Sequence, residues 1–174
     1  MIFNTANVNV DKGYEFLRKE HIADYQYFFN RVDIQLTDKI PTIPTDKLLS
    51  QYRSGKHDTY LEELFFQYGR YLLIASSRVG SLPPNLQGVW TQYDFSPWSG
   101  GYWHNVNVQM NYWHVFNTNL SELFNPYMEY NEAFRKAGVQ KAIDYITRHN
   151  PTALNPINEE NGWTIASILK AVAP

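Results

Sequence analysis

The chain has no cysteine among its 174 residues, which excludes a disulfide framework, a thiolate metal site and a thiol nucleophile. Basic residues are too few to form a nucleic-acid surface, because 15 lysines and arginines against 17 acidic residues leave a net charge of -2. No apolar run reaches the roughly 18 residues of a membrane span. The five histidines form no ligand-spaced cluster with carboxylates, so the sequence predicts no metal and no other cofactor.

The first ten residues, MIFNTANVNV, lack both the basic start and the apolar run of a secretory signal. If Met1 is the genuine start, the sequence predicts a cytoplasmic protein. A chain without cysteine gives no redox indication of its compartment.

One stretch, from Arg78 to Glu122, concentrates flat aromatic rings and neutral amides, and Asp94 is the only Asp, Glu, Lys or Arg between its ends. It holds four of the five tryptophans: Trp90, Trp98, Trp103 and Trp113. Its amides are Asn85, Gln87, Gln92, Asn105, Asn107, Gln109, Asn111, Asn117 and Asn119. Aromatic faces cover sugar C–H groups and amides exchange hydrogen bonds with hydroxyls, so the stretch suits a neutral polyhydroxylated ligand. Aromatic core packing with turn-capping amides is the alternative.

Apolar residues spaced by three and four predict helices around this stretch. The predicted helices cover residues 12–32, 45–53, 60–77, about 105–116 and 126–147, with a short apolar segment at 164–174 that also reads as helix. Thr59 and Glu62 fit a capping box for the third helix, which is apolar nearly all round and is therefore expected to be buried on most sides. Gly69 inside it indicates close packing or a backbone contact.

Prolines and glycines exclude regular helix through most of residues 79–103, and an ordered loop of this length is usually functional. No convincing pair of alternating strands is present. The sequence therefore predicts an all-α protein with long aromatic-rich loops.

Several words of this sequence, in order, resemble the catalytic domain of glycoside hydrolase family 95, the inverting α-L-fucosidases. They are FQYGRYLLIASSR at 66–78, PPNLQGVW at 83–90, PW at 97–98, NVNVQMNYW at 105–113 and NLSE at 119–122. A weaker match reaches upstream to HIADYQYFFNRV at 21–32 and downstream to ENGWT at 160–164, so the resemblance covers nearly the whole chain.

The resemblance implies an (α/α)6 barrel whose loops form a sugar pocket, with residues 1–174 as a single segment, the first part of that barrel, cut short at its C-terminal end. It also implies hydrolysis with inversion, in which the two asparagines of the Asn-x-Asn word, Asn105 and Asn107, hold the attacking water. An amide carbonyl can orient water but is too weak a base to keep its proton, so a carboxylate elsewhere must support the step. The family's general acid and supporting Asp lie downstream of residue 174, so we expect this chain alone to be inactive and, as a partial barrel, to self-associate.

The candidate substrate-binding residues are Gln87, Trp90, Trp98, Trp103 and His104. Trp103 stands where the family often has a pocket histidine, and His104 is adjacent. Each has a structural alternative: Asn105 and Asn107 as helix N-caps, Gln87 and Trp90 as loop supports, Trp98 and Trp103 as buried packing. The expected partner is a fucosylated oligosaccharide or glycan, or a related α-L-galactoside. A non-catalytic carbohydrate-binding helical protein, or a helical fragment without a ligand, is the alternative.

Overall fold

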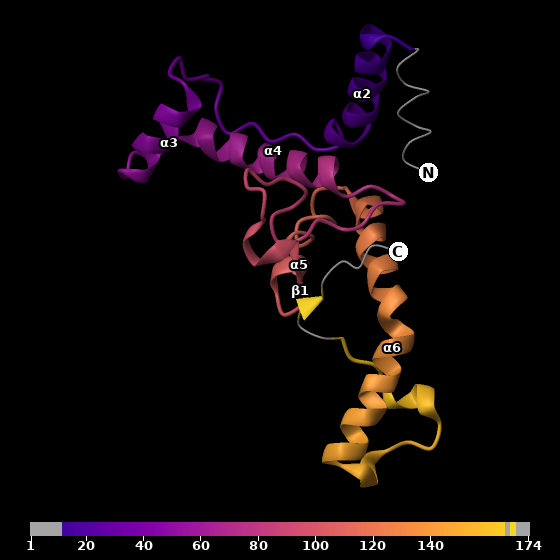
Figure 1. Cartoon of the computed structure of the whole chain (residues 1–174). Helices are drawn as coiled ribbons and strands as arrows, with labels where there is room; N and C mark the ends of the chain where they lie inside the picture. The colour runs from indigo at the N-terminus through magenta and orange to yellow at the C-terminus, as the bar shows by residue number, and fades with distance from the viewer. Residues whose placement is uncertain (1–11, 166–167, 170–174) are drawn as a thin grey trace. The chain divides into compact units, whose positions relative to one another are not determined.

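The computed structural model describes residues 12–165 and 168–169 of the chain. They belong to two compact units, Met1–Ala75 and Ser76–Pro174. The elements are mostly helices with little strand, in agreement with the predicted all-α class (Figure 1). Among the helices in this described part, none has the length and hydropathy needed to cross a membrane.

The described part of the first unit contains the helices α2 (Tyr14–Phe29), α3 (Thr45–Arg53) and α4 (Thr59–Ser76), the last of which ends at the first residue of the second unit. The bounds of α3 are those predicted. The cap of α4 differs from the predicted box, because the Asp58 side chain accepts the Leu61 amide at 2.9 Å. Glu62 instead accepts the Tyr52 hydroxyl at 2.8 Å.

The buried guanidinium of Arg70, only 1% exposed, links α4 to the end of α2. It donates to the carbonyl oxygens of Val32 at 2.7 Å, Phe29 at 2.9 Å and Phe28 at 3.3 Å, and to the Gln67 side chain at 2.8 Å. The carbonyls at the end of a helix have no partner within the helix, so Arg70 satisfies groups that burial would otherwise penalise. Burial lowers the pKa of Arg70, and the electrostatic effects of Tyr25 and Asp33 counter this only in part.

The apolar stripe of α2 is not buried, since no residue of α2 is buried and Tyr14 is 73% exposed. Both expectations for α4 are wrong. Helix α4 is buried on one side only, with Phe65 78% exposed, and a Cβ added at Gly69 would meet nothing within 4 Å. Hydrophobic periodicity shows which face of a helix could be covered, but the covering element must come from elsewhere.

The second unit contains η1 (Pro97–Gly100), β1 (Tyr102–Trp103), α5 (Asn107–Met110), η2 (Ser121–Phe124), α6 (Asn125–His149), η3 (Pro151–Ala153), η4 (Asn158–Asn161) and β2 (Ile168–Leu169), where η marks a 3-10 helix. The long helix α6, orange in Figure 1, extends the predicted helix by one residue at its start and two at its end.

Helix α5 is much shorter than predicted, because the chain tightens after Met110 into turns. The Tyr112 amide bonds the Gln109 carbonyl at 3.0 Å and the Trp113 amide bonds the Met110 carbonyl at 3.2 Å, both three residues back. Turns continue until Asn119, which has a left-handed φ of 54°. The helical spacing in the sequence therefore marks buried turns rather than a continuous helix.

The C-terminal segment forms a strand instead of the predicted helix, as far as it is described. Strand β2 pairs antiparallel with β1, Tyr102 opposite Leu169 and Trp103 opposite Ile168. Residues 166–167 and 170–174 of the predicted helix lie outside the described residues. Two-residue strands paired across more than sixty positions leave no alternating pattern in the sequence.

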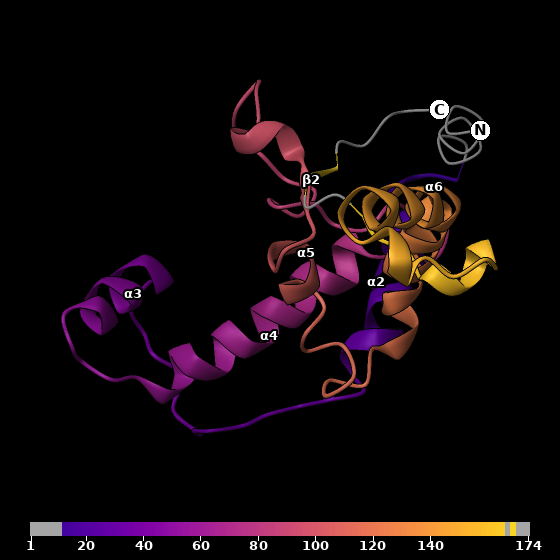
Figure 2. The ribbon, with the colours of Figure 1, turned by 90° about the horizontal axis from the view of Figure 1, so that it is seen from below.

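The core of the second unit lies between β1, α5 and α6. Tyr102, Val108 and Tyr130 are buried together, with Tyr127 and Phe134 packed against them. After α6 the chain turns back along the helix, which Figure 2 shows nearly end-on. This return places β2 beside β1.

Candidate active site

A tight turn at Asn85–Gly88 forms the first part of the site. The Asn85 and Gly88 backbones bond each other in both directions, at 3.1 and 3.0 Å, and the Asn85 side chain accepts the Gln87 amide at 2.9 Å. Gly88 has a φ of 73°, a left-handed conformation that glycine adopts without strain. The sequence Asn-Leu-Gln-Gly therefore makes a closed, rigid turn.

Side chains from later in the chain anchor this turn. The Tyr102 hydroxyl donates to the Pro83 carbonyl at 2.7 Å, and the Asn111 amide donates to the Asn85 carbonyl at 3.1 Å. Gln87 donates to the Pro97 carbonyl at 2.6 Å. The predicted residue Gln87 thus joins the turn to η1, the segment that contains Trp98.

The two loop tryptophans present exposed faces. Trp98 is 65% exposed and Trp90 45% exposed, so full burial, the alternative for Trp98, does not hold. Trp98 and Ser99 both have left-handed φ angles, 54° and 57°. Such residues cost on the order of 1–3 kcal/mol each and cluster at functional sites. The Trp90 ring lies over Gly88, where a Cβ would be 3.3 Å from it.

His104 and Trp103 lie at the end of β1, against α6. The rings of His104 and Tyr130 stack with centroids 5.5 Å apart and planes 2° apart. The Nε2 of His104 and the Nε1 of Trp103 are buried, and neither has a hydrogen-bond partner among the described residues. Burial lowers the pKa of His104, so its ring is neutral near pH 7.

Asn105 and Asn107 flank the start of α5, and neither caps it. The N-cap is Val106, which makes no side-chain capping bond, so the N-cap alternative is wrong. Asn105 is exposed and its side-chain oxygen accepts the Val106 amide at 2.9 Å, while Asn107 is the first residue of α5 and partly buried. The two residues are separated by a single position in a turn.

The buried polar atoms of this region are neutral and include both hydrogen-bond donors and acceptors. Those without a partner in the described part of the second unit include Gln87 Oε1, Trp103 Nε1, His104 Nε2, Gln109 Oε1 and the Tyr130 hydroxyl. Buried polar groups are normally paired, so each of these atoms is suited to an additional polar partner such as water or a ligand hydroxyl. Gln109 and Tyr130 were not among the predicted site residues. The sequence could have indicated Gln109, because it lies inside the NVNVQMNYW word. Tyr130 lies on an apolar helix face, a position that is typical of a core residue.

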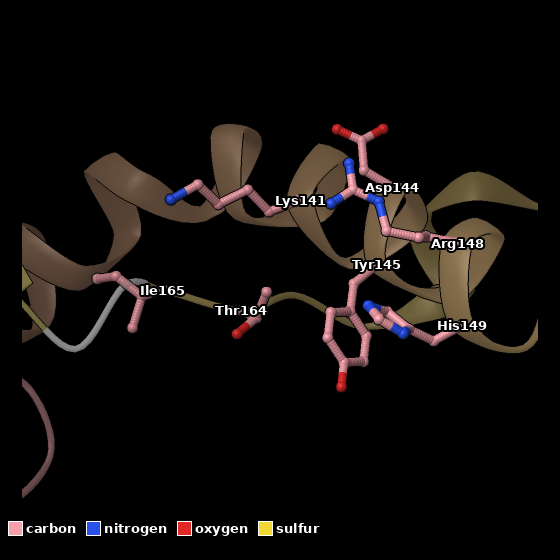
Figure 3. Close-up of a pocket in the computed structure, with 7 residues that line it drawn as sticks. All are labelled: Lys141, Asp144, Tyr145, Arg148, His149, Thr164 and Ile165. Atoms are coloured by element: carbon pink, nitrogen blue, oxygen red, sulfur yellow. The ribbon is translucent and has the colours of Figure 1, made fainter.

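Two hollows in the described residues lie along α6. One, of about 320 Å³, is lined by Lys141, Asp144, Tyr145, Arg148, His149, Thr164 and Ile165 (Figure 3). In it the centroids of the Tyr145 and His149 rings are 4.4 Å apart. The other, of about 410 Å³, is lined by residues of α6 with Gly162 and Trp163. No predicted site residue lines either of these two hollows.

No group of three or more His, Cys, Asp or Glu in the described part could hold a metal ion. Asp94, the single carboxylate of the aromatic stretch, lies in an exposed bend at residues 92–95. The site therefore offers aromatic faces and neutral hydrogen-bonding groups, without a charged group at its centre.

Exposed tryptophans and neutral amides suit a neutral polyhydroxylated ligand, and the comparison with known families gives the class of protein. Residues 13–171 match the model of the glycosyl hydrolase family 95 catalytic domain. The chain belongs to this family, which confirms the resemblance of its sequence words.

Curated relatives agree with the family match. The chain is 47% identical to "Probable alpha-fucosidase A" of Aspergillus niger over 131 residues. This match covers 74% of this chain and 16% of the relative. It is 46% identical over 123 residues to the protein of the same name from Aspergillus oryzae, covering 66% of the chain and 17% of the relative. It is 41% identical over 135 residues to "Alpha-L-fucosidase 2" of Arabidopsis thaliana, and this match covers 75% of the chain and 16% of the relative. The matched part is therefore about a sixth of these relatives' length.

Proposed function

We propose that residues 1–174 are the first part of an (α/α)6-barrel glycoside hydrolase that removes terminal α-L-fucose, or the related L-galactose, from oligosaccharides or glycans. Family membership supports the hydrolase class, and the relatives' names support the fucoside. The observation that carries the proposal is the composition of the site, which combines exposed Trp90 and Trp98 with neutral, buried polar atoms in the same unit.

The ligand chemistry matches these groups. Fucose is neutral, carries hydroxyls that both donate and accept hydrogen bonds, and has a methyl group that suits an aromatic face. Trp90 and Trp98 would supply such faces, and Gln87, Trp103 and His104 would supply hydrogen bonds. A charged ligand would find no counter-charge among these residues.

The reaction assigns distinct roles to the chain and to groups outside it. Inverting hydrolysis needs an acid for the leaving oxygen and an activated water on the opposite face of the sugar. Asn105 and Asn107 would orient that water through their side-chain carbonyls, but an amide cannot take its proton. The general acid and a supporting carboxylate must come from other residues of the parent enzyme. We infer that the 174-residue chain alone hydrolyses no fucoside.

A non-catalytic carbohydrate-binding protein is the second candidate. It is favoured by the absence of any carboxylate among the predicted site residues. The two candidates differ in whether Asn105 and Asn107 affect turnover once the rest of the catalytic domain is supplied.

The isolated chain provides the first test. Fucose release from 2′-fucosyllactose should be undetectable, while NMR titration with the same sugar should shift the indole resonances of Trp90 and Trp98, and glucose should not. An absence of shifts would contradict the sugar-facing assignment. Turnover that is lost in Asp94→Asn would make Asp94 the acid and overturn the division of roles.

A further inference from the structure

His104, the residue before Asn105, is held from two sides. Its ring stacks on Tyr130 of α6, nearly parallel at 2° with centroids 5.5 Å apart. Its carbonyl accepts the Gln109 side-chain amide at 2.6 Å. Because a carbonyl can only accept, the nitrogen of the Gln109 amide must face it, which leaves the Gln109 oxygen buried on the other side. The backbone that leads into Asn105 is thereby tied to both α5 and α6.

Tyr130 connects this backbone to the core. It is 7% exposed, and its ring packs against Tyr102 at 4.6 Å and edge-on against Phe134 at 5.0 Å. Tyr102 in turn is fixed by its bond to the Pro83 carbonyl. The Tyr130 ring therefore lies between the anchored strand β1 and the body of α6.

The hydroxyl of Tyr130 plays no part in this connection. It is buried without a hydrogen-bond partner among the described residues, whereas the Tyr102 hydroxyl reaches Pro83 and the Tyr112 hydroxyl reaches Ser77 at 2.8 Å. The contribution of Tyr130 is its ring, which supplies the flat face that the imidazole needs.

We propose that Tyr130 is a positioning residue of the site: its ring fixes His104, and through His104 it sets the placement of Asn105 and Asn107. The catalytic meaning of this placement rests on the proposed function, but the placement itself does not. Asn105 is exposed and lies in a turn, so it has little packing of its own. Misplacement of a catalytic group by about 1 Å can cost on the order of 100-fold in rate, which makes such support consequential.

The test compares three variants of the 174-residue chain by ¹H–¹⁵N NMR without sugar. Tyr130→Leu removes the stacked ring and should shift the amide and side-chain resonances of Asn105 and Asn107. Tyr130→Phe keeps the ring and should leave them in place. Phe134→Leu is the matched control, because it removes an aromatic ring of the same helix and core cluster whose ring contact is with Tyr130, and it should lower the Tm while leaving the asparagine resonances unchanged.

Unchanged asparagine resonances in Tyr130→Leu, or equal shifts in Phe134→Leu, would overturn the proposal. If Tyr130→Leu does not fold, Tyr130→Met decides, because it also removes the flat ring while a flexible side chain fills more of the space, and it should shift Asn105 and Asn107; unshifted asparagines there would also overturn the proposal. A parallel titration with 2′-fucosyllactose separates the two claims. A wild-type chain that gives no sugar-induced shift at Asn105 or Asn107 counts against the proposed function, while the sugar-free comparison still decides the role of Tyr130.

Discussion

The amide of Thr164 donates to the carbonyl of Gly138 at 3.1 Å, so the segment that returns from α6 lies directly on the helix backbone. A Cβ at Gly138 would be 2.9 Å from the Thr164 oxygen and 3.1 Å from the Trp163 ring. The glycine is what allows this close approach, which in turn leads the chain towards β2 and its pairing with β1.

The first prediction compares two helical glycines. Gly138→Ala should destabilise the chain and release Trp163, seen as a red shift of its fluorescence, because overpacking against a backbone atom costs about 1–3 kcal/mol. Gly69→Ala, where a Cβ meets nothing within 4 Å, should instead stabilise by up to about 1 kcal/mol. Thermal unfolding of both variants checks this, and a Gly138→Ala chain as stable as Gly69→Ala would contradict the docking of the return segment.

The second prediction separates the three buried tyrosines. Tyr102→Phe and Tyr112→Phe each remove a hydrogen bond, to Pro83 and to Ser77, and should cost about 1 kcal/mol. Tyr130→Phe removes a hydroxyl that has no partner in the described residues and should cost nothing or stabilise slightly. Urea unfolding measures the three free energies. A loss in Tyr130→Phe as large as in the other two would show that the hydroxyl has a protein partner.

The third prediction concerns pH. Burial lowers the pKa of His104 below its ordinary value of 6.5. At a pH between the two pKa values of His104, the unfolded chain binds more protons than the folded chain. The free energy of unfolding therefore falls as the pH drops below about 6.5, and above that pH His104 adds no pH dependence to it. His104→Gln should show a shallower decline of stability between pH 6.5 and 5. Equal slopes in the two chains would show that His104 titrates normally.

The fourth prediction concerns the exposed rings. Phe65, Phe95 and Trp113 are 78%, 92% and 65% exposed, and large uncovered apolar surface normally leads to association. The isolated chain should therefore self-associate and bind a hydrophobic dye. Sedimentation velocity tests this, and a monodisperse monomer with a sharp thermal transition would contradict it.

The sequence predicts the family and most of the helices better than the packing between them. The ordered words, above all NVNVQMNYW, identify the family, and the helical spacing finds α3, α4 and α6. The sequence does not predict the strands β1 and β2, because their pairing joins Tyr102 to Leu169, which are far apart in the chain. After Asn107, apolar residues at spacings of three and four are compatible with successive turns as well as with a continuous helix.

Tyr130 shows why part of the site could not be read from the sequence. An aromatic residue at helical spacing is typical of a core, and Tyr130 is indeed in the core. Its relation to His104 arises only when α6 packs against β1, a contact between distant segments. The same limit applies to two glycines inside predicted helices, which the sequence does not distinguish. A Cβ at Gly69 would meet nothing within 4 Å, whereas a Cβ at Gly138 would be in close contact with Thr164 and Trp163.

The central claim is that this chain supplies the water-holding asparagines of an α-L-fucosidase. A chimera tests it most directly, in which residues 13–171 replace the matching segment of Alpha-L-fucosidase 2 of Arabidopsis thaliana. We predict that the chimera releases fucose from 2′-fucosyllactose and that Asn105→Ala or Asn107→Ala lowers kcat by about 10² or more, with a smaller change in KM. A chimera that keeps its full turnover in either variant would contradict the account.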